Sequence, residues 1–173
     1  MEWLTETKIP LGQWISSLMD ALNEHADFVF YTISDVLEFI IENTIDFLVW
    51  LPALLIIAAF GVLAAVVHKS WKLTAFTVLS LLLVVNLGYW EETMETLALV
   101  IYATLFCMLI GVPLGVASAH RPWLHQAMRP VLDLMQTIPT FVYLIPTLIL
   151  FGLGVVPGLI STVIFAIAAP IRL

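Results

Sequence analysis

The 173-residue sequence has an apolar composition that excludes an ordinary soluble domain. Hydrophobic residues make up 62% and charged residues 11%, against roughly 45–50% and about 25% in soluble proteins, and the mean hydropathy is +1.07. Thirteen acidic residues outnumber six basic ones, and the net charge of −7 argues against a nucleic-acid partner, which needs a basic surface. The composition therefore predicts a protein of the lipid bilayer.

Residues 1–46 form a first region in which charges recur and no apolar run is long enough to cross a bilayer. Apolar side chains recur there every three or four residues, and Asp35, Glu38 and Glu42 mark an opposite face. The pattern predicts two amphipathic helices, which either lie on the membrane surface or against partner subunits, or pack on the protein's own helices. The apolar positions are Leu11, Trp14, Ile15, Leu18, Met19 and Leu22, and then Val29, Ile33, Val36, Leu37 and Ile40.

Four stretches without a charged residue make up most of the remaining chain. A helix needs about 20 apolar residues to cross the roughly 30 Å hydrocarbon core of a bilayer. The first three stretches have 21, 18 and 24 residues, so each is long enough for one crossing, and the fourth has 38 residues, about twice that length. The stretches are residues 47–67, 73–90, 96–119 and 134–171.

The fourth stretch is interrupted by a cluster of residues that favour turns: Gly152, Gly154, Pro157 and Gly158. It therefore predicts two spans joined by a tight turn. The whole pattern predicts an all-α integral membrane protein with five transmembrane helices preceded by amphipathic helices. The predicted regions are the amphipathic segment 1–46, two N-terminal transmembrane helices in 47–90, and three further transmembrane helices in 96–173.

The distribution of charge predicts the orientation of these spans. Five of the six basic residues fall in connections that the five-helix topology places on one side of the membrane, and twelve of the thirteen acidic residues fall on the other. Connections rich in Lys and Arg face the cytoplasm, so the N-terminus is predicted outside and the C-terminus inside. The five cations are Lys69, Lys72, Arg121, Arg129 and Arg172, and the acidic residue on their side is Asp133.

The sequence lacks the motifs HExxH, GxSxG and GxxxxGK[ST], which are typical of zinc peptidases, serine hydrolases and P-loop NTPases. His120 and His125 are five residues apart, a spacing that does not place both on one helical face, so no metal site is expected. The predicted spans also hold no charged residue of the kind that couples transport to an ion gradient. Any active transport would therefore use ATP bound by another chain, and no catalytic residue or cofactor is expected in this one.

Glycine and proline residues in the later spans predict close helix packing or bent helices. Gly111 and Gly115 form a GxxxG pattern with Pro113 between them, which lets another helix approach closely. Pro113, Pro139 and Pro146 also predict helices bent around a cavity, where protein or water satisfies the interrupted backbone.

A series of polar residues recurs at intervals of three and four along the fourth predicted span: Asp133, Gln136, Thr140, Tyr143 and Thr147. On one helix this spacing forms a single stripe, which must contact protein or water rather than lipid. Three interpretations are open: a substrate pathway, hydrogen-bonded packing between helices, or an interface with a partner subunit.

Two further features favour the pathway interpretation. Tyr143 and Phe141 offer ring faces that bind a quaternary ammonium group at roughly 0.5–2 kcal/mol. Asp133 is expected at the cytoplasmic mouth of the pathway, because a carboxylate at the centre of the bilayer costs roughly 2.5–3.5 kcal/mol on insertion scales.

The sequence also resembles a known family, the permease subunits of glycine betaine, proline betaine or choline ABC importers, called ProW-type permeases. The C-terminal run carries the most specific likeness, in its portions LDLMQTIPTFVYLIP and LFGLGVVPG. The similar segments are RPVLDLMQTIPTFVYLIPTLILFGLGVVPGLISTVIFAIAAPIRL (129–173), ETMETLALVIYATLFCMLIGVPLGVASA (92–119), and IPLGQWISSLMDAL near the N-terminus, which is similar to the family's leader region.

The resemblance implies a multi-pass protein of the bacterial inner membrane that helps to import a quaternary amine osmolyte. Its implied partners are a second permease copy, a cytoplasmic ABC ATPase that binds ATP and Mg²⁺, and an external substrate-binding protein. In such permeases a loop with an EAA-type coupling helix follows, whereas this sequence ends at Leu173, so we expect the N-terminal part of a permease. The alternative is a non-transporting membrane scaffold or assembly subunit, or an inactive permease fragment.

Overall fold

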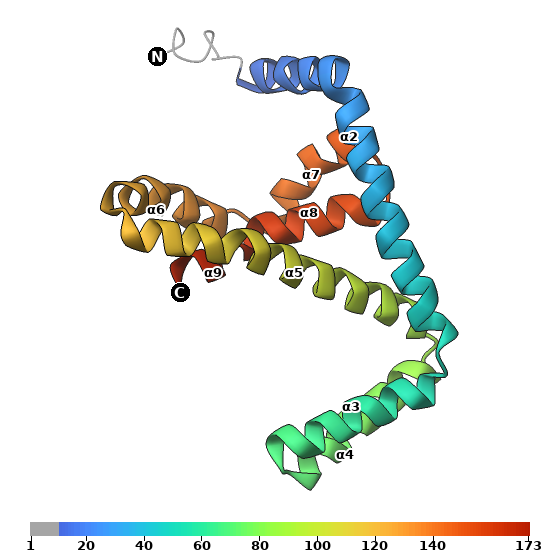
Figure 1. Ribbon diagram of the computed structural model, residues 1–173. Helices are drawn as coiled ribbons and strands as arrows, with labels where there is room; N and C mark the ends of the chain where they lie inside the picture. The colour runs from blue at the N-terminus through green and yellow to red at the C-terminus, as the bar shows by residue number, and fades with distance from the viewer. Residues whose placement is uncertain (1–10) are drawn as a thin grey trace, which may run out of the picture. The chain divides into compact units, whose positions relative to one another are not determined.

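The computed structural model describes residues 11–173, and these residues form α-helices without any strand. The prediction of an all-α protein is confirmed. Figure 1 shows the helices in chain order: α2 (Leu11–Trp50), α3 (Ala53–His68), α4 (Trp71–Asn86), α5 (Trp90–His120), α6 (Pro122–Thr137), α7 (Thr140–Phe151), α8 (Val155–Ala166) and α9 (Ala168–Arg172).

The N-terminal amphipathic region is one helix, α2, over the whole of its described part. The two predicted helices are therefore joined in one uninterrupted helix, which bends sharply in its N-terminal part (Figure 1), and residues 1–10 lie outside the described part of the chain. The reason lies in the sequence, because no glycine or proline occurs between Gly12 and Pro52 to end the helix. The predicted boundary between residues 46 and 47 falls inside α2.

The stretch 47–67 does not form one straight helix, which corrects the prediction of a single span there. Helix α2 ends at Trp50, α3 begins at Ala53, and the two helix directions differ by 94°. Pro52 explains the break, because proline lacks the backbone N–H of a helix interior and disfavours helical geometry at the preceding residue.

Helices α3 and α4 pack against each other as a hairpin. Each has 16 residues, and a Cβ atom added at Gly61 of α3 would lie only 2.9 Å from Cγ2 of Val78 in α4. At about 1.5 Å per residue α4 is some 24 Å long, shorter than the stretch 73–90 predicted. It ends at Asn86, and Gly88 adopts a positive φ of 81° in the turn before α5.

Two breaks lie between α6 and α8. The sequence predicted the glycine turn, and at Pro139 it predicted a bend within one helix and not a break. The glycine turn is confirmed: Gly152 and Gly154 have φ of 80° and 140° between α7 and α8. The other break lies between α6 and α7, whose directions differ by 96°, so the prediction of one continuous helix from residue 134 to the glycine turn is wrong. Pro139 is the cause, because it has no N–H, and Ile138 before it is extended, with ψ of 129°.

Two helices in the described part of the chain are long and apolar enough to cross a membrane: α5, and the segment Val155–Arg172 that joins α8 and α9. The number rises to four if each of the two bent pairs counts as one span, and α4 is a shorter apolar helix. A membrane protein is therefore supported, and the count of five spans and the orientation of the termini remain predictions.

The chain divides into two compact units. One unit comprises residues 39–105, and its buried side chains include Ile56, Met94 and Ala98. The other unit comprises residues 106–173 together with the described residues 11–38, and contains a core in which Leu132 of α6 packs with Ala168 and Ile171 of α9.

Within the second unit, the C-terminal half of α5 runs in the same direction as α8 and α9. The Sγ atom of Cys107 lies 3.8 Å from the carbonyl oxygen of Val163 in α8. Further along α5, Gly111 lies against Pro170 and Gly115 lies against the backbone of Ile171. Residue numbers therefore rise together along the two neighbouring segments (Figure 1).

Candidate functional site

The polar residues that the sequence assigned to one stripe are divided between two helices. Asp133 and Gln136 lie on α6, and Thr140, Tyr143 and Thr147 lie on α7, beyond the bend at Pro139. Because the two helices point in directions 96° apart, the five side chains do not follow one face. Each of them therefore has its own surroundings.

Thr147 lies in a buried hydroxyl cluster between α7 and α8. Its Oγ1 atom is 2.9 Å from Oγ of Ser161 and 3.0 Å from the carbonyl oxygen of Tyr143, and both side chains are only 5% exposed. The Ser161 hydroxyl in turn donates to the carbonyl of Pro157 at 2.7 Å. Thr147 is fully hydrogen-bonded within the hairpin, which favours the packing interpretation at this position.

Tyr143 satisfies a carbonyl that the bend at Pro139 leaves without its helical partner. In a continuous helix the carbonyl of Met135 would accept a hydrogen bond from the amide of residue 139, which proline lacks. The Tyr143 hydroxyl donates to this carbonyl instead, at 3.1 Å, and its side chain is half-buried. Tyr143 therefore connects the first turn of α7 to the last turn of α6.

Gln136, Thr140 and Phe141 are exposed in this chain. Phe141 is the most exposed of the predicted aromatic residues, at 76%. These three residues are therefore free of the packing that occupies Thr147, and they remain candidates for a pathway wall or for a contact with a partner subunit.

Asp133 forms an ion pair with Arg172, which joins α6 to α9. Both side chains are partly exposed. Because solvent screens such an ion pair, the pair contributes little to the stability of the fold. The acidic residue assigned to the cytoplasmic mouth is thus held beside the C-terminal ends of α5 and α9.

The two predicted packing glycines both lie close to α9, whereas only one of the three predicted bending prolines lies at a bend. A Cβ atom added at Gly111 would lie 2.7 Å from Cγ of Pro170, and one at Gly115 would lie 3.0 Å from the carbonyl oxygen of Ile171. Helix α5 continues through Pro113 and α7 continues through Pro146, whereas Pro139 marks a bend.

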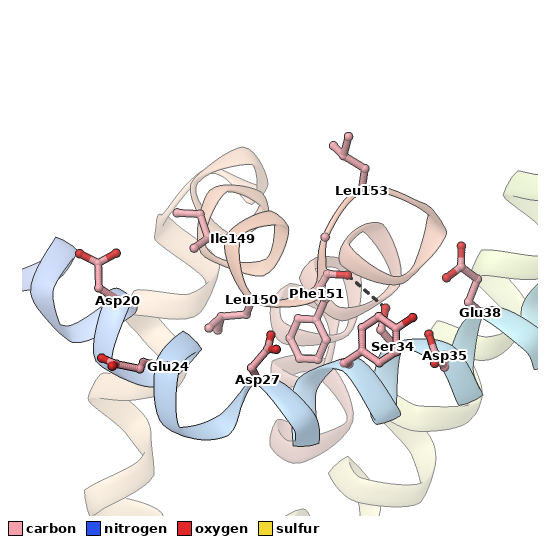
Figure 2. A pocket seen from close by; sticks show the side chains of 12 residues that line it. Asp20, Glu24, Asp27, Ser34, Asp35, Glu38, Ile149, Leu150, Phe151 and Leu153 are labelled. Atoms are coloured by element: carbon pink, nitrogen blue, oxygen red, sulfur yellow. Dashed lines mark hydrogen bonds between the residues drawn. The ribbon is translucent and has the colours of Figure 1, made fainter.

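Sequence reasoning missed an acidic cavity of about 800 Å³, shown in Figure 2. One wall is a face of α2, and the other wall is the end of α7 with the glycine turn, residues 149–153. The sequence does contain a sign of this cavity: acidic residues on α2 are three, four or eight positions apart, and residues with this spacing lie on one face of a helix. The carboxylates are those of Asp20, Glu24, Asp27, Asp35 and Glu38.

Three side chains spaced four residues apart on α2 lie beside the end of α7 and the glycine turn. The ring of Phe30 packs edge-on against that of Phe151, with centroids 5.3 Å apart. The Ser34 hydroxyl donates to the carbonyl of Phe151 at 3.1 Å, the interaction dashed in Figure 2. Further along, Oε1 of Glu38 would lie 3.3 Å from a Cβ atom added at Gly154. This face of α2 therefore fixes the turn.

Comparison with known proteins identifies relatives over nearly the whole chain. Residues 111–173 match the family described as the binding-protein-dependent transport system inner membrane component. The chain is 38% identical, over 97% of its length, to the glycine betaine/proline betaine transport system permease protein ProW of Escherichia coli. It is 38% identical over 95% of its length to the glycine betaine/carnitine transport permease protein GbuB of Listeria monocytogenes, and 34% identical over 96% to the glycine betaine transport system permease protein OpuAB of Bacillus subtilis. The chain covers 47%, 59% and 58% of these relatives, about half their length.

Proposed function

We propose that this chain belongs to the family of binding-protein-dependent inner-membrane transport components, which its residues 111–173 match, and that it forms part of the permease of an ABC importer. The observation that carries the proposal is the identity of 34–38% to three transport permeases over 95–97% of the chain. The proposed cargo is a quaternary amine osmolyte, since the names of all three relatives include glycine betaine. Proline betaine and choline belong to the same chemical class.

The chemistry of the chain is compatible with such a cargo. A trimethylammonium group is a bulky cation that exposed aromatic rings and nearby carboxylates both attract. Phe141 offers an exposed ring, and the cavity beside the glycine turn is lined by carboxylates. The proposed pathway residues are Gln136, Thr140, Tyr143 and Phe141, with Asp133 at the cytoplasmic mouth. Thr147, which the sequence also assigned to the pathway, is proposed as a packing residue because its hydroxyl is buried and hydrogen-bonded.

The proposed topology has five spans, with the N-terminus outside and the C-terminus in the cytoplasm. The parallel course of α5 and α8–α9 supports its second half, because two successive apolar helices with the same direction need a return crossing between them. The segment that joins them includes α6 and α7, a bent pair with the composition of one span. The basic connections support the orientation.

A labelling experiment tests this topology. In a Cys107→Ser background, Glu92→Cys should react with a membrane-impermeant maleimide added to intact cells, because it begins the span of α5 on the outer side. Ser70→Cys lies in the basic connection between α3 and α4, and should react only after the cells are permeabilised. Reaction of Ser70→Cys in intact cells would show that the orientation is the reverse.

The proposed partners follow from the mechanism of a binding-protein-dependent importer. An external substrate-binding protein delivers the amine, a cytoplasmic ATPase supplies the energy by hydrolysing ATP with Mg²⁺, and a second permease copy completes the pathway wall. The five proposed spans supply only part of a pathway wall, so the proposal includes this second copy.

Uptake of radiolabelled glycine betaine tests the function directly. In cells without betaine importers of their own, the assembled importer that contains this chain should accumulate the label, and omission of the ATPase should reduce uptake to the level of the empty vector. If the complex purifies intact but uptake stays at that level, the non-transporting scaffold is the correct alternative.

A further inference from the structure

A second cavity in the same compact unit, of about 240 Å³, lies where the ends of α5 and α9 meet α6. Its polar lining comprises Ser118, His125, Arg129, Asp133 and Arg172. Two guanidinium groups and one imidazole therefore surround a space with a single carboxylate. This lining is the opposite of the acidic cavity beside the glycine turn.

One of the two arginines that line this second cavity, Arg129, is available to bind an anion. Arg172 is paired with Asp133, whereas Arg129 makes no ion pair with any residue of the described range 11–173. Ser118 is only 5% exposed, and its hydroxyl lies 3.5 Å from Nδ1 of His125. A buried hydroxyl, an imidazole and a planar guanidinium are the donors that hold phosphate oxygens, and guanidinium can do so with two parallel hydrogen bonds.

The position of the cavity identifies the kind of phosphate. Helix α5, one of the two described helices that are long and apolar enough to cross a membrane, ends beside it at His120, and Ile171 and Arg172 of the parallel α8–α9 segment line it. The end of α5 places the cavity near one membrane surface, where hydrocarbon gives way to lipid headgroups. Basic pockets between transmembrane helices at this depth bind anionic headgroups.

We propose that this cavity binds the phosphate group of an anionic phospholipid. Arg129 holds the phosphate, the Arg172–Asp133 pair forms one side of the site, and the apolar ends of α5 and α9 contact the upper acyl chains. The site shares Asp133 with the proposed cytoplasmic mouth of the pathway. Binding of lipid needs neither the ATPase nor the binding protein, so it can be measured in their absence.

Lipid retention by the purified chain tests the proposal. Native mass spectrometry of the chain in a neutral detergent should show one retained phosphatidylglycerol and no retained phosphatidylcholine. Arg129→Gln should lower the retained fraction about five-fold, the effect expected for one basic residue near an anionic membrane surface, and Arg129→Lys should retain part of the binding. Arg121→Gln is the matched control, because Arg121 is exposed in the same connection but does not line the cavity.

The remaining outcomes contradict the proposal. Equal losses in Arg129→Gln and Arg121→Gln would mean that lipid is attracted by diffuse charge and not by the cavity. Displacement of the lipid by millimolar inorganic phosphate, with equal binding of phosphate in detergent alone, would assign the site to the free anion. Equal retention of phosphatidylcholine, whose choline cation cancels the charge of its phosphate, would show that the net negative charge of the headgroup does not select the lipid.

Discussion

Replacing Gly111 by alanine should lower the free energy of unfolding by about 1–2 kcal/mol, although alanine is the better helix former. The new Cβ atom would lie 2.7 Å from Cγ and 3.2 Å from Cβ of Pro170, and 3.4 Å from Cγ1 of Ile167. A proline ring cannot turn away as a flexible side chain does, so the α9 backbone itself must move. Unfolding of the purified chain by increasing sodium dodecyl sulfate in mixed micelles measures the difference.

Gly158→Ala is the matched control for this prediction. Gly158 also lies inside a helix of the same compact unit, but a Cβ atom added there has no other atom within 4 Å. Alanine at Gly158 should therefore raise the stability by up to about 1 kcal/mol, through helix propensity alone. If the two variants shift stability in the same direction and by the same amount, the close approach of α5 and α9 does not limit side-chain size, and the GxxxG pattern has no packing role.

The sequence predicted features that depend on local backbone preference. The charge-free stretch 96–119 lies within α5, and the cluster of glycines at residues 152–158 begins with the two positive-φ residues that join α7 to α8. Glycine allows such a turn because it adopts φ angles that other residues avoid. A different property of glycine, its lack of a side chain, was the reason to predict close helix approach at Gly111 and Gly115.

The break at Pro52 was missed, and Pro139 was expected to bend one helix and not to divide it in two, because a count of charges measures hydropathy and not the supply of backbone donors. Both prolines lie in charge-free stretches, so the stretches look continuous although the helices turn by 94° and 96°. The sequence also did not reveal which group satisfies the free carbonyl at the second break. That group is the hydroxyl of Tyr143, which donates to the carbonyl of Met135 eight residues earlier.

The acidic cavity could not be predicted because its walls are far apart in the sequence. Its carboxylates occupy α2, and the opposite wall begins more than 100 residues later, at the end of α7. The hydrogen bond between Ser34 and Phe151 joins residues 117 positions apart. Periodicity identifies one face of a helix, but the element that covers that face is set by the tertiary fold.

Two threonines on α7 should separate packing from transport, because the same isosteric change at each removes a hydroxyl with different surroundings. Thr147→Val deletes one member of the buried cluster with Ser161, so it should lower the free energy of unfolding by about 0.6–1.7 kcal/mol, the range measured for hydrogen bonds between membrane helices. Thr140 is exposed, and its hydroxyl makes no hydrogen bond within residues 11–173. Thr140→Val should therefore leave unfolding unchanged.

The same pair of variants tests the substrate pathway in the assembled importer. Thr140→Val should lower the uptake of glycine betaine several-fold at normal expression and normal assembly, because the exposed hydroxyl is proposed to line the pathway. Thr147→Val should lower uptake only in proportion to the amount of folded complex, since its hydroxyl is occupied within the hairpin. Normal uptake by Thr140→Val would remove Thr140 from the pathway, and a loss of uptake by Thr147→Val at full assembly would show that the α7–α8 hydroxyl cluster opens during transport.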